Sequence, residues 1–295
     1  MKRNSIFAGI ILCVILLATA SCSNENETLV DNNALAPVRV HVSGFNVSQE
    51  DFPETRAAQN VANYSGINAV MLAFYEADGT EAYKRTQAKT DADFGEFSLS
   101  LPMGTYTMVA LAYYYSDNSP LSLTSPTVAS FTGSRAFETF AATQEVTISN
   151  TNAVDISATL SRIIAQLKVV STDGKTADVT NVRMTLSAGG KDFNPSTGFA
   201  TVNTGIANMV GNSADVGANS TSSTFLFLIT DEQNINVTIE TLDADGAVLF
   251  SKTVSNVPFQ RNRVTKLSGA MYTNTAVAGS FQVSTEWISE HTMDF

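Results

Sequence analysis

Cysteine and histidine are the residues best suited to nucleophilic or metal chemistry, and this chain contains only two of each. Cys13 and Cys22 lie near the N-terminus, His41 follows in an early strand-like segment, and His291 lies near the C-terminus. Neither histidine stands at a metal-ligand spacing, and no G-x-S-x-G motif or phosphate-binding loop occurs. With 28 Asp and Glu residues, the sequence leaves a catalytic carboxylate pair open, but the placement of these residues in turns favours a structural role. We therefore expect no catalytic residue, metal or cofactor, and surface or strand-edge histidines.

The three consecutive tyrosines Tyr113–Tyr115 indicate a different chemistry. Tyrosine rings pack against flat apolar surfaces while their hydroxyls form hydrogen bonds, so an exposed row could stack on sugars. The row ends a strand-like segment, and alternation buries at least one of the three rings. Core packing with exposure at the edge is the expected role, and sugar stacking is the alternative.

The N-terminus has the order of a secretory signal. Lys2 and Arg3 precede a nearly unbroken apolar run over residues 6–18, which is too short to span a bilayer. Three small or hydroxyl-bearing residues then lead into Cys22 in a pattern that resembles the bacterial lipobox. We predict that residues 1–21 are a lipoprotein signal peptide and that Cys22 is the acylated first mature residue. An ordinary signal peptide with a chance cysteine is the alternative.

Charge and cysteine content limit the function classes. The net charge is −11, and loss of Lys2 and Arg3 makes it −13, which disfavours nucleic acid and anionic membrane as partners. With Cys13 removed and Cys22 acylated, no cysteine is free for a disulfide, so stability must come from burial. The polar, acidic residues 22–36 are predicted to be a flexible tether.

Strand-like alternation recurs along the chain, and helical periodicity is nearly absent. Val38, Val40 and Val42 point to one side of an extended segment. The segments 76–79 and 243–246 both end in Asp-Gly between apolar runs, which indicates hairpin turns. These features predict an all-β protein with two tandem β-sandwich domains.

The expected domains are residues 37–161 and residues 162–295, joined without a Pro- or Gly-rich linker. Residues 203–224 are rich in Gly, Asn, Ser and Thr and are predicted to be a long surface loop. Residues 116–145 are also expected to be mostly loop, with a short helical turn around 135–140.

Five segments in a fixed order carry a family resemblance: 54–57 (ETRA), 101–106 (LPMGTY), 160–167 (LSRIIAQL), 256–265 (NVPFQRNRVT) and 281–287 (FQVSTEW). Together they resemble the type V fimbrillin family, the pilins and anchor subunits of gut and oral Gram-negative bacteria. Each motif is moderately specific, and their order supports the resemblance. It implies two transthyretin-like sandwiches, while a generic surface β-sandwich lipoprotein is the alternative.

The resemblance also implies a route of assembly. A trypsin-like protease would cut between Arg56 and Ala57, which removes residues 37–56 and opens the groove filled by the three valines. A strand of a neighbouring subunit would then enter the groove by strand addition.

The C-terminal residues 279–295 are the expected donor strand. Phe281, Val283, Thr285 and Trp287 share one side of an extended segment, which is the pattern that a donor requires. The same segment could instead be the last strand of its own domain.

The resemblance therefore implies a fimbrial subunit at the cell surface, involved in cell adhesion. Its partners would be other fimbrial subunits, a trypsin-like processing protease and, through the lipid on Cys22, the outer membrane. One alternative is an uncleaved, lipid-anchored base or accessory subunit of the fimbrium. A surface glycan-binding lipoprotein that uses aromatic residues such as Tyr113–Tyr115 is another.

Overall fold

The computed structural model describes residues 34–46, 60–273 and 281–287. This part of the chain consists of strands and connecting turns, without an α-helix, and so offers no apolar helix of membrane-spanning length. The strands are β1 (Leu35–Asn46), β2 (Ala69–Glu76), β3 (Glu81–Ala88), β4 (Glu96–Pro102), β5 (Gly104–Tyr113), β6 (Leu121–Ser125), β7 (Val128–Phe131), β8 (Thr139–Ile148), β9 (Val154–Arg162), β10 (Ala165–Ser171), β11 (Asn181–Leu186), β12 (Asp192–Phe193), β13 (Ile206–Gly211), β14 (Thr221–Leu226), β15 (Glu232–Leu242), β16 (Val248–Gln260), β17 (Arg263–Gly269) and β18 (Gln282–Trp287).

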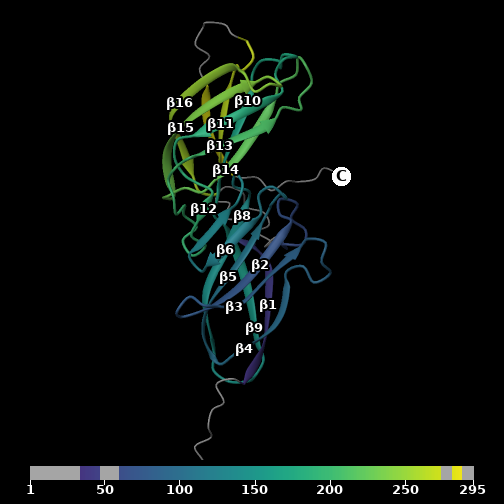
Figure 1. The fold of residues 1–295 in the computed structure, drawn as a ribbon, viewed down its shortest axis with the longest axis vertical. Coiled ribbons are helices and arrows are strands. Elements are labelled where there is room, and N and C mark those ends of the chain that lie inside the picture. Colours follow the sequence, from purple (N-terminus) through teal and green to yellow (C-terminus); the bar gives the residue numbers. More distant parts are fainter. Residues whose placement is uncertain (1–33, 47–59, 274–280, 288–295) are drawn as a thin grey trace, which may run out of the picture. The chain divides into compact units, whose positions relative to one another are not determined.

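The first sandwich is built on a seven-stranded sheet with the order β3-β2-β5-β8-β9-β1-β4 (Figure 1). All neighbouring strands in it are antiparallel except β1 and β9, which are parallel. One hydrophobic cluster draws on β1, β2, β4, β5, β8 and β9, including Val40, Phe74 and Phe97. Strands from both halves of the sheet thus share a single core. β1 begins at Leu35, so residues 35–36 belong to this strand rather than to the expected tether.

β2 and β5 are buried on both faces, which explains their nearly continuous apolar sequences. Their second face carries Met71 and Leu111 and packs in a cluster with Phe131 and Phe227. The prediction of a loop over 116–145 is therefore wrong, because β6, β7 and most of β8 lie there. The helical turn expected around 135–140 is also wrong, since Ala136 instead forms an isolated antiparallel bridge with Phe225.

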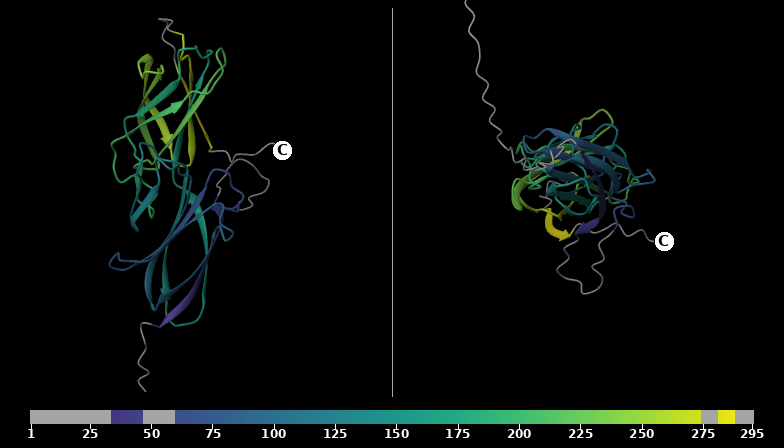
Figure 2. Two further views of the ribbon diagram at one scale, coloured as in Figure 1. Left: turned by 45° about the vertical axis from the view of Figure 1, so that its right-hand side comes forward. Right: turned by 90° about the horizontal axis from the view of Figure 1, so that it is seen from below.

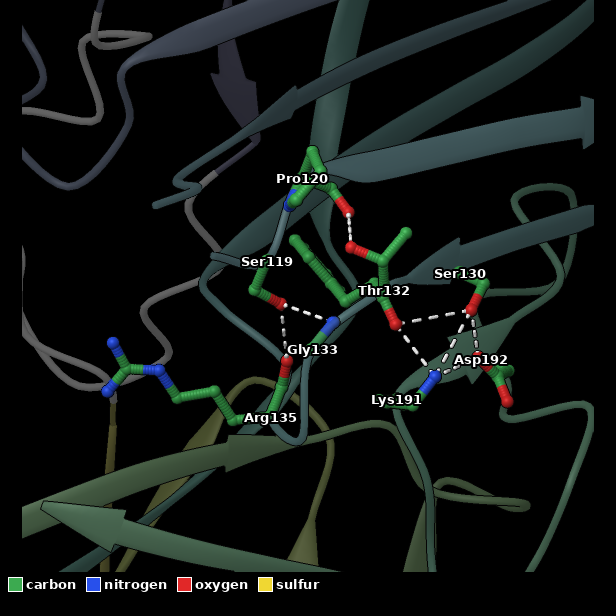
Figure 3. Close-up of polar contacts among 9 residues, drawn as sticks. Ser119, Pro120, Ser130, Thr132, Gly133, Arg135, Lys191 and Asp192 are labelled. Atoms are coloured by element: carbon green, nitrogen blue, oxygen red, sulfur yellow. Dashed lines mark hydrogen bonds and ion pairs between the residues drawn. The ribbon is translucent and has the colours of Figure 1, made fainter. Parts of the chain in front are cut away.

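The small sheet β12-β7-β6 is held by polar contacts as well as by this cluster. Lys191 donates to the Phe131 carbonyl (2.7 Å) and to Asp192 (3.1 Å), and Ser130 also bonds Asp192 (Figure 3). Ser119 accepts a hydrogen bond from the Gly133 amide at 3.0 Å. The Lys191–Phe131 and Ser130–Asp192 contacts join segments that are about sixty residues apart in the chain.

The second sandwich consists of two four-stranded sheets, β14-β10-β17-β18 and β13-β11-β15-β16. Its core contains Leu167, Val182, Ile239 and Phe259, among others. The prediction of a surface loop over 203–224 is wrong, since β13 and the start of β14 lie there. The physical reason is that polar residues such as Asn208 and Thr224 occupy inward positions of these strands, so the apolar alternation is lost.

Both predicted Asp-Gly turns are confirmed. Gly79 and Gly246 have φ values of 87° and 84°, in the left-handed region that glycine adopts without a steric cost. The turns connect β2 to β3 and β15 to β16 as antiparallel hairpins. The all-β class with two β-sandwiches is likewise confirmed, and Figure 1 colours the first sandwich purple to teal and the second mainly green to yellow.

Candidate functional site: the slot filled by β1

The candidate site is the slot in the first sheet that β1 occupies. Alternate residues of β1 face the core, and Ala36, Val38, Val40 and Val42 are at most 1% exposed. The intervening residues Pro37, Arg39 and His41 are exposed. This is the pattern expected for the three valines, and it follows from the two-residue period of an extended strand.

β1 is an interior strand of the sheet, with β4 on one side and β9 on the other. Val40 is in register with Phe97 of the antiparallel β4 and with Ile156 of the parallel β9. Among the described strands, β4 has no other neighbour in the sheet. Figure 2 shows β1, in purple, running alongside the teal strands of this sheet. Loss of β1 would therefore expose the edge of β9, an apolar channel and the whole of β4.

The exposed side of β1 carries His41, one of the two histidines. It is in register with Glu96 of β4, and its Nδ1 contacts the Glu96 carboxylate. Both side chains are about half exposed. Across residues 34–46, 60–273 and 281–287, no group of three or more His, Cys, Asp or Glu side chains could hold a metal ion. The His41–Glu96 pair is thus a cross-strand contact between β1 and β4.

Phe45, near the end of β1, covers a buried polar cluster that sequence reasoning did not identify. Its ring lies 4.0 Å from the Phe140 ring and 5.3 Å from the Tyr64 ring, measured between centroids. Beneath these rings, Arg162 Nε donates to Glu138 at 2.9 Å, and the Tyr64 hydroxyl donates to the same carboxylate oxygen at 2.6 Å. We call Tyr64, Glu138 and Arg162 the polar hub.

The polar hub is almost fully buried. The side chains of Arg162 and Glu138 are 4% and 5% exposed, and Tyr64 is 2% exposed. Burial, together with the Glu138 carboxylate, raises the pKa of the Tyr64 hydroxyl above its ordinary value, so Tyr64 remains a donor. Arg162 also donates to the Asn262 side chain at 3.1 Å. An arginine that ends the alternating β9 indicates a buried charge, but nothing local in the sequence names its partners.

The predicted lipidation and processing residues cannot be placed. Cys22, Arg56 and Ala57 lie outside the described residues. The described chain resumes at Asn60 and leads directly to Tyr64 of the polar hub. The predictions for these three residues therefore remain sequence predictions.

The expected donor residues lie partly in β18, which pairs with β17 at the edge of its own domain's sheet. Val283 is 42% exposed, and Thr285 is also exposed. Phe281 is half-buried and packs against the second core. Trp287 is in backbone register with Arg263. β18 is thus joined to the sheet through one neighbouring strand, and its described side chains contribute little burial.

The tyrosine row divides between burial and exposure, as predicted. Tyr113 is 3% exposed and belongs to the cluster under β6 and β7, whereas Tyr114 is 41% exposed. Tyr115 is half-buried, and its amide donates to the Asn68 side chain at 3.0 Å. Burial raises the pKa of the Tyr113 hydroxyl to about 12. Of the three rings, only that of Tyr114 is largely available to a ligand.

A family model described as "Family of unknown function (DUF6562)" matches residues 38–294, and no curated protein gives a significant match. Among solved structures, the fimbrial anchor protein Mfa2 from Porphyromonas gingivalis is similar at 13% identity and a TM-score of 0.51, over 88% of this chain and 100% of that chain. A candidate adhesin from Bacteroides ovatus is similar at 12% identity and a TM-score of 0.52, over 88% of this chain and 97% of that chain. These likenesses confirm the fimbrillin resemblance at the level of the fold.

Proposed function

Because this chain belongs to the DUF6562 family, which carries no assigned function, we propose a function from its geometry: it is a structural subunit of surface fimbriae. In this proposal it is exported as an outer-membrane lipoprotein on Cys22. A trypsin-like protease cuts after Arg56, and the subunit polymerises when a strand of a neighbouring subunit replaces β1. The product supports cell adhesion.

The observation that carries the proposal is the interior position of β1 with its apolar side in the core. Burial of a valine side chain contributes about 1.5–3 kcal/mol, and β1 contributes three such valines besides Phe45. A vacated slot therefore has a strong driving force to take up another strand with apolar residues at alternate positions. The residues from Phe281 to Trp287 have that spacing.

Position in the chain adds a second support. Cys22 and β1 both precede Arg56, so a single cut would separate the folded body from the lipid and from β1 together. The chain starting at Ala57 would still contain β2–β18. Lipid anchoring would then serve delivery of the subunit before assembly.

An uncleaved, lipid-anchored base subunit is the second candidate. It is favoured by the likeness to the fimbrial anchor Mfa2, which this chain covers completely, and by the pairing of β18 within its own sheet. In that case β1 remains in place and the lipid on Cys22 holds the fimbrium at the membrane.

The mass of the native protein from the cell surface separates the two candidates. A polypeptide that begins at Ala57 supports the polymerising subunit, whereas one that begins at acylated Cys22 refutes it and supports the anchor.

Strand addition has its own test, in which the body from Ala57 to Trp287, which keeps β18 beside β17, is mixed with a synthetic peptide of residues 279–295. Saturable binding is expected. A matched peptide in which Phe281 and Val283 are replaced by serine should bind at least about tenfold more weakly, because it lacks two apolar contacts. Equal binding of both peptides would refute the slot as their site.

A further inference from the structure

A cavity of about 420 Å³ opens beside the polar hub, and neither β1 nor β18 lines it. Its wall combines Tyr114, Arg135 and Phe137 from the first half of the chain with Gln166, Asn208 and Thr224 from β10, β13 and β14. The volume falls within the range of about 300–1,000 Å³ that is usual for small-molecule sites. Its mixture of aromatic rings and polar groups is also typical of such sites.

The aromatic side of the cavity is held in place by the backbone. The Tyr114 amide donates to the Glu138 carbonyl at 3.0 Å, and Ala136 bridges to Phe225 of β14. The rings of Tyr114 and Phe137 lie 5.4 Å apart. Tyr114 is the exposed member of the tyrosine row, so it presents a supported ring to the cavity.

Two polar side chains on the opposite side are buried. Asn208 and Thr224 are each 2% exposed and line the cavity. The Thr224 hydroxyl is fully buried and makes no hydrogen bond to any residue that the structure describes. A buried polar group without a partner costs about 1–3 kcal/mol, so the Thr224 hydroxyl on this wall indicates a ligand that supplies a hydrogen bond.

The cavity also carries one cation without a carboxylate partner among the described residues, that of Arg135. Its guanidinium carbon lies 4.5 Å from the centre of the Phe137 ring. In Figure 3 the Arg135 side chain extends away from the surrounding polar contacts, and no dashed line reaches its guanidinium. Glu138 also lines the cavity, but Arg162 balances its charge. The wall therefore has one uncompensated positive charge, in the planar form that binds carboxylates bidentately.

From these features we infer that the cavity binds an acidic sugar, such as a uronic acid residue of a glycan. The pyranose ring lies against Tyr114, the hydroxyls bond Thr224, Asn208 and Gln166, and the carboxylate bonds Arg135. A sugar fits better than a peptide terminus because it presents hydroxyls on several sides, matching the polar groups on the opposite wall. The inference does not depend on cleavage at Arg56, because no described residue of β1 lines the cavity.

Binding of methyl glucuronide and of its neutral counterpart, methyl glucoside, to the full mature chain tests this inference by calorimetry or ligand-observed NMR. We expect the glucuronide to bind at least about tenfold more tightly, because only it can form the charge-assisted pair. Arg135→Gln should abolish this preference, and Tyr114→Ala should weaken both sugars. Arg85→Gln is the matched control, since Arg85 pairs with Asp93 on the surface and does not line the cavity.

Four results would overturn the inference. One is equal binding of the acidic and neutral sugars, and another is loss of the preference in Arg85→Gln as well as in Arg135→Gln. The third is binding of an acetylated dipeptide carboxylate in place of either sugar. The fourth is the absence of binding by any of these ligands, which would leave ordered water as the partner of Thr224. Because Tyr114 and Arg135 are not buried, their variants should keep the fold, as circular dichroism can verify.

Discussion

Replacement of Glu138 by glutamine should destabilise the protein strongly, because it leaves Arg162 as a buried cation. The Arg162 and Glu138 side chains are 4% and 5% exposed, with 2.9 Å between Nε and the carboxylate oxygen. Two unit charges about 4 Å apart interact by about 4 kcal/mol at an effective dielectric constant of about 20. Loss of one partner of a buried pair costs about 3–5 kcal/mol. Tyr64, Asn262 and the Phe140 ring still contact Arg162, so we expect a loss near the lower end, about 3 kcal/mol.

The assay is urea unfolding of the full mature chain followed by far-ultraviolet circular dichroism. Glu240→Gln is the matched control, because Glu240 accepts from Arg183 at 2.6 Å but the two side chains are 16% and 37% exposed. A partly exposed pair contributes at most about 1 kcal/mol. The double variant Glu138→Leu with Arg162→Met should recover much of the loss, since an apolar pair removes both desolvated charges.

Two outcomes would refute this reasoning. One is a loss of unfolding free energy in Glu138→Gln that is below about 1 kcal/mol or no larger than the loss in Glu240→Gln. Either result would mean that water reaches the polar hub. The other is a double variant as unstable as the sum of the two single changes, which would show that the side chains do not act as a pair.

Three further variants test other parts of the structure by unfolding free energy. Val40→Ala should cost about 2 kcal/mol because it removes two methyl groups at a 1% exposed position. Arg39→Ala, on the exposed side, should cost less than about 0.5 kcal/mol. Equal losses would contradict the assignment of the buried side of β1. Phe193→Ala should cost about 3–5 kcal/mol, because this buried ring stacks on Phe227 at 4.1 Å, and a loss under about 1 kcal/mol would contradict that packing. Asp173→Asn should lower the unfolding free energy by about 1 kcal/mol near neutral pH. The difference in unfolding free energy between variant and parent should shrink as the pH falls below about 4. A difference that stays constant with pH would contradict an ionised acceptor.

The sign of the Asp173 prediction follows from its contacts. Partial burial raises the pKa of this carboxyl, but the amides of residues 271–273 and the Thr273 hydroxyl donate to it and leave the pKa below its ordinary value. A lowered pKa means that the ionised group stabilises the fold above the unfolded pKa and that this contribution is lost on acidification. The asparagine variant lacks the charge at every pH, so the two curves converge in acid.

Features that depend on local periodicity could be predicted from the sequence. The alternation of Val38, Val40 and Val42 established which side of β1 is buried, and the two Asp-Gly pairs established the hairpin turns. Both effects act within a few residues, through the geometry of an extended backbone and through the conformational freedom of glycine. The all-β class follows from the repetition of such signals along the chain.

Local patterns failed where polar residues face inward. Asn208 and Thr224 occupy buried positions of β13 and β14, so these strands resembled a loop in the sequence. The elements that surround the cavity bury these two side chains, and those elements lie far apart in the sequence, so a short sequence window does not reveal the burial. The same two residues are central to the inferred sugar site, which sequence analysis did not detect.

Long-range pairing was decided by the tertiary structure alone. The parallel register of Val40 with Ile156 joins residues more than a hundred positions apart, and the contact of Arg162 with Asn262 likewise joins distant parts of the chain. Sequence reasoning supplied the apolar side of β1, but only the sheet order shows that β1 lies inside the sheet between β4 and β9. The physical reason is that alternation specifies which face of a strand is buried, whereas its neighbours depend on backbone hydrogen bonds that any sequence can form.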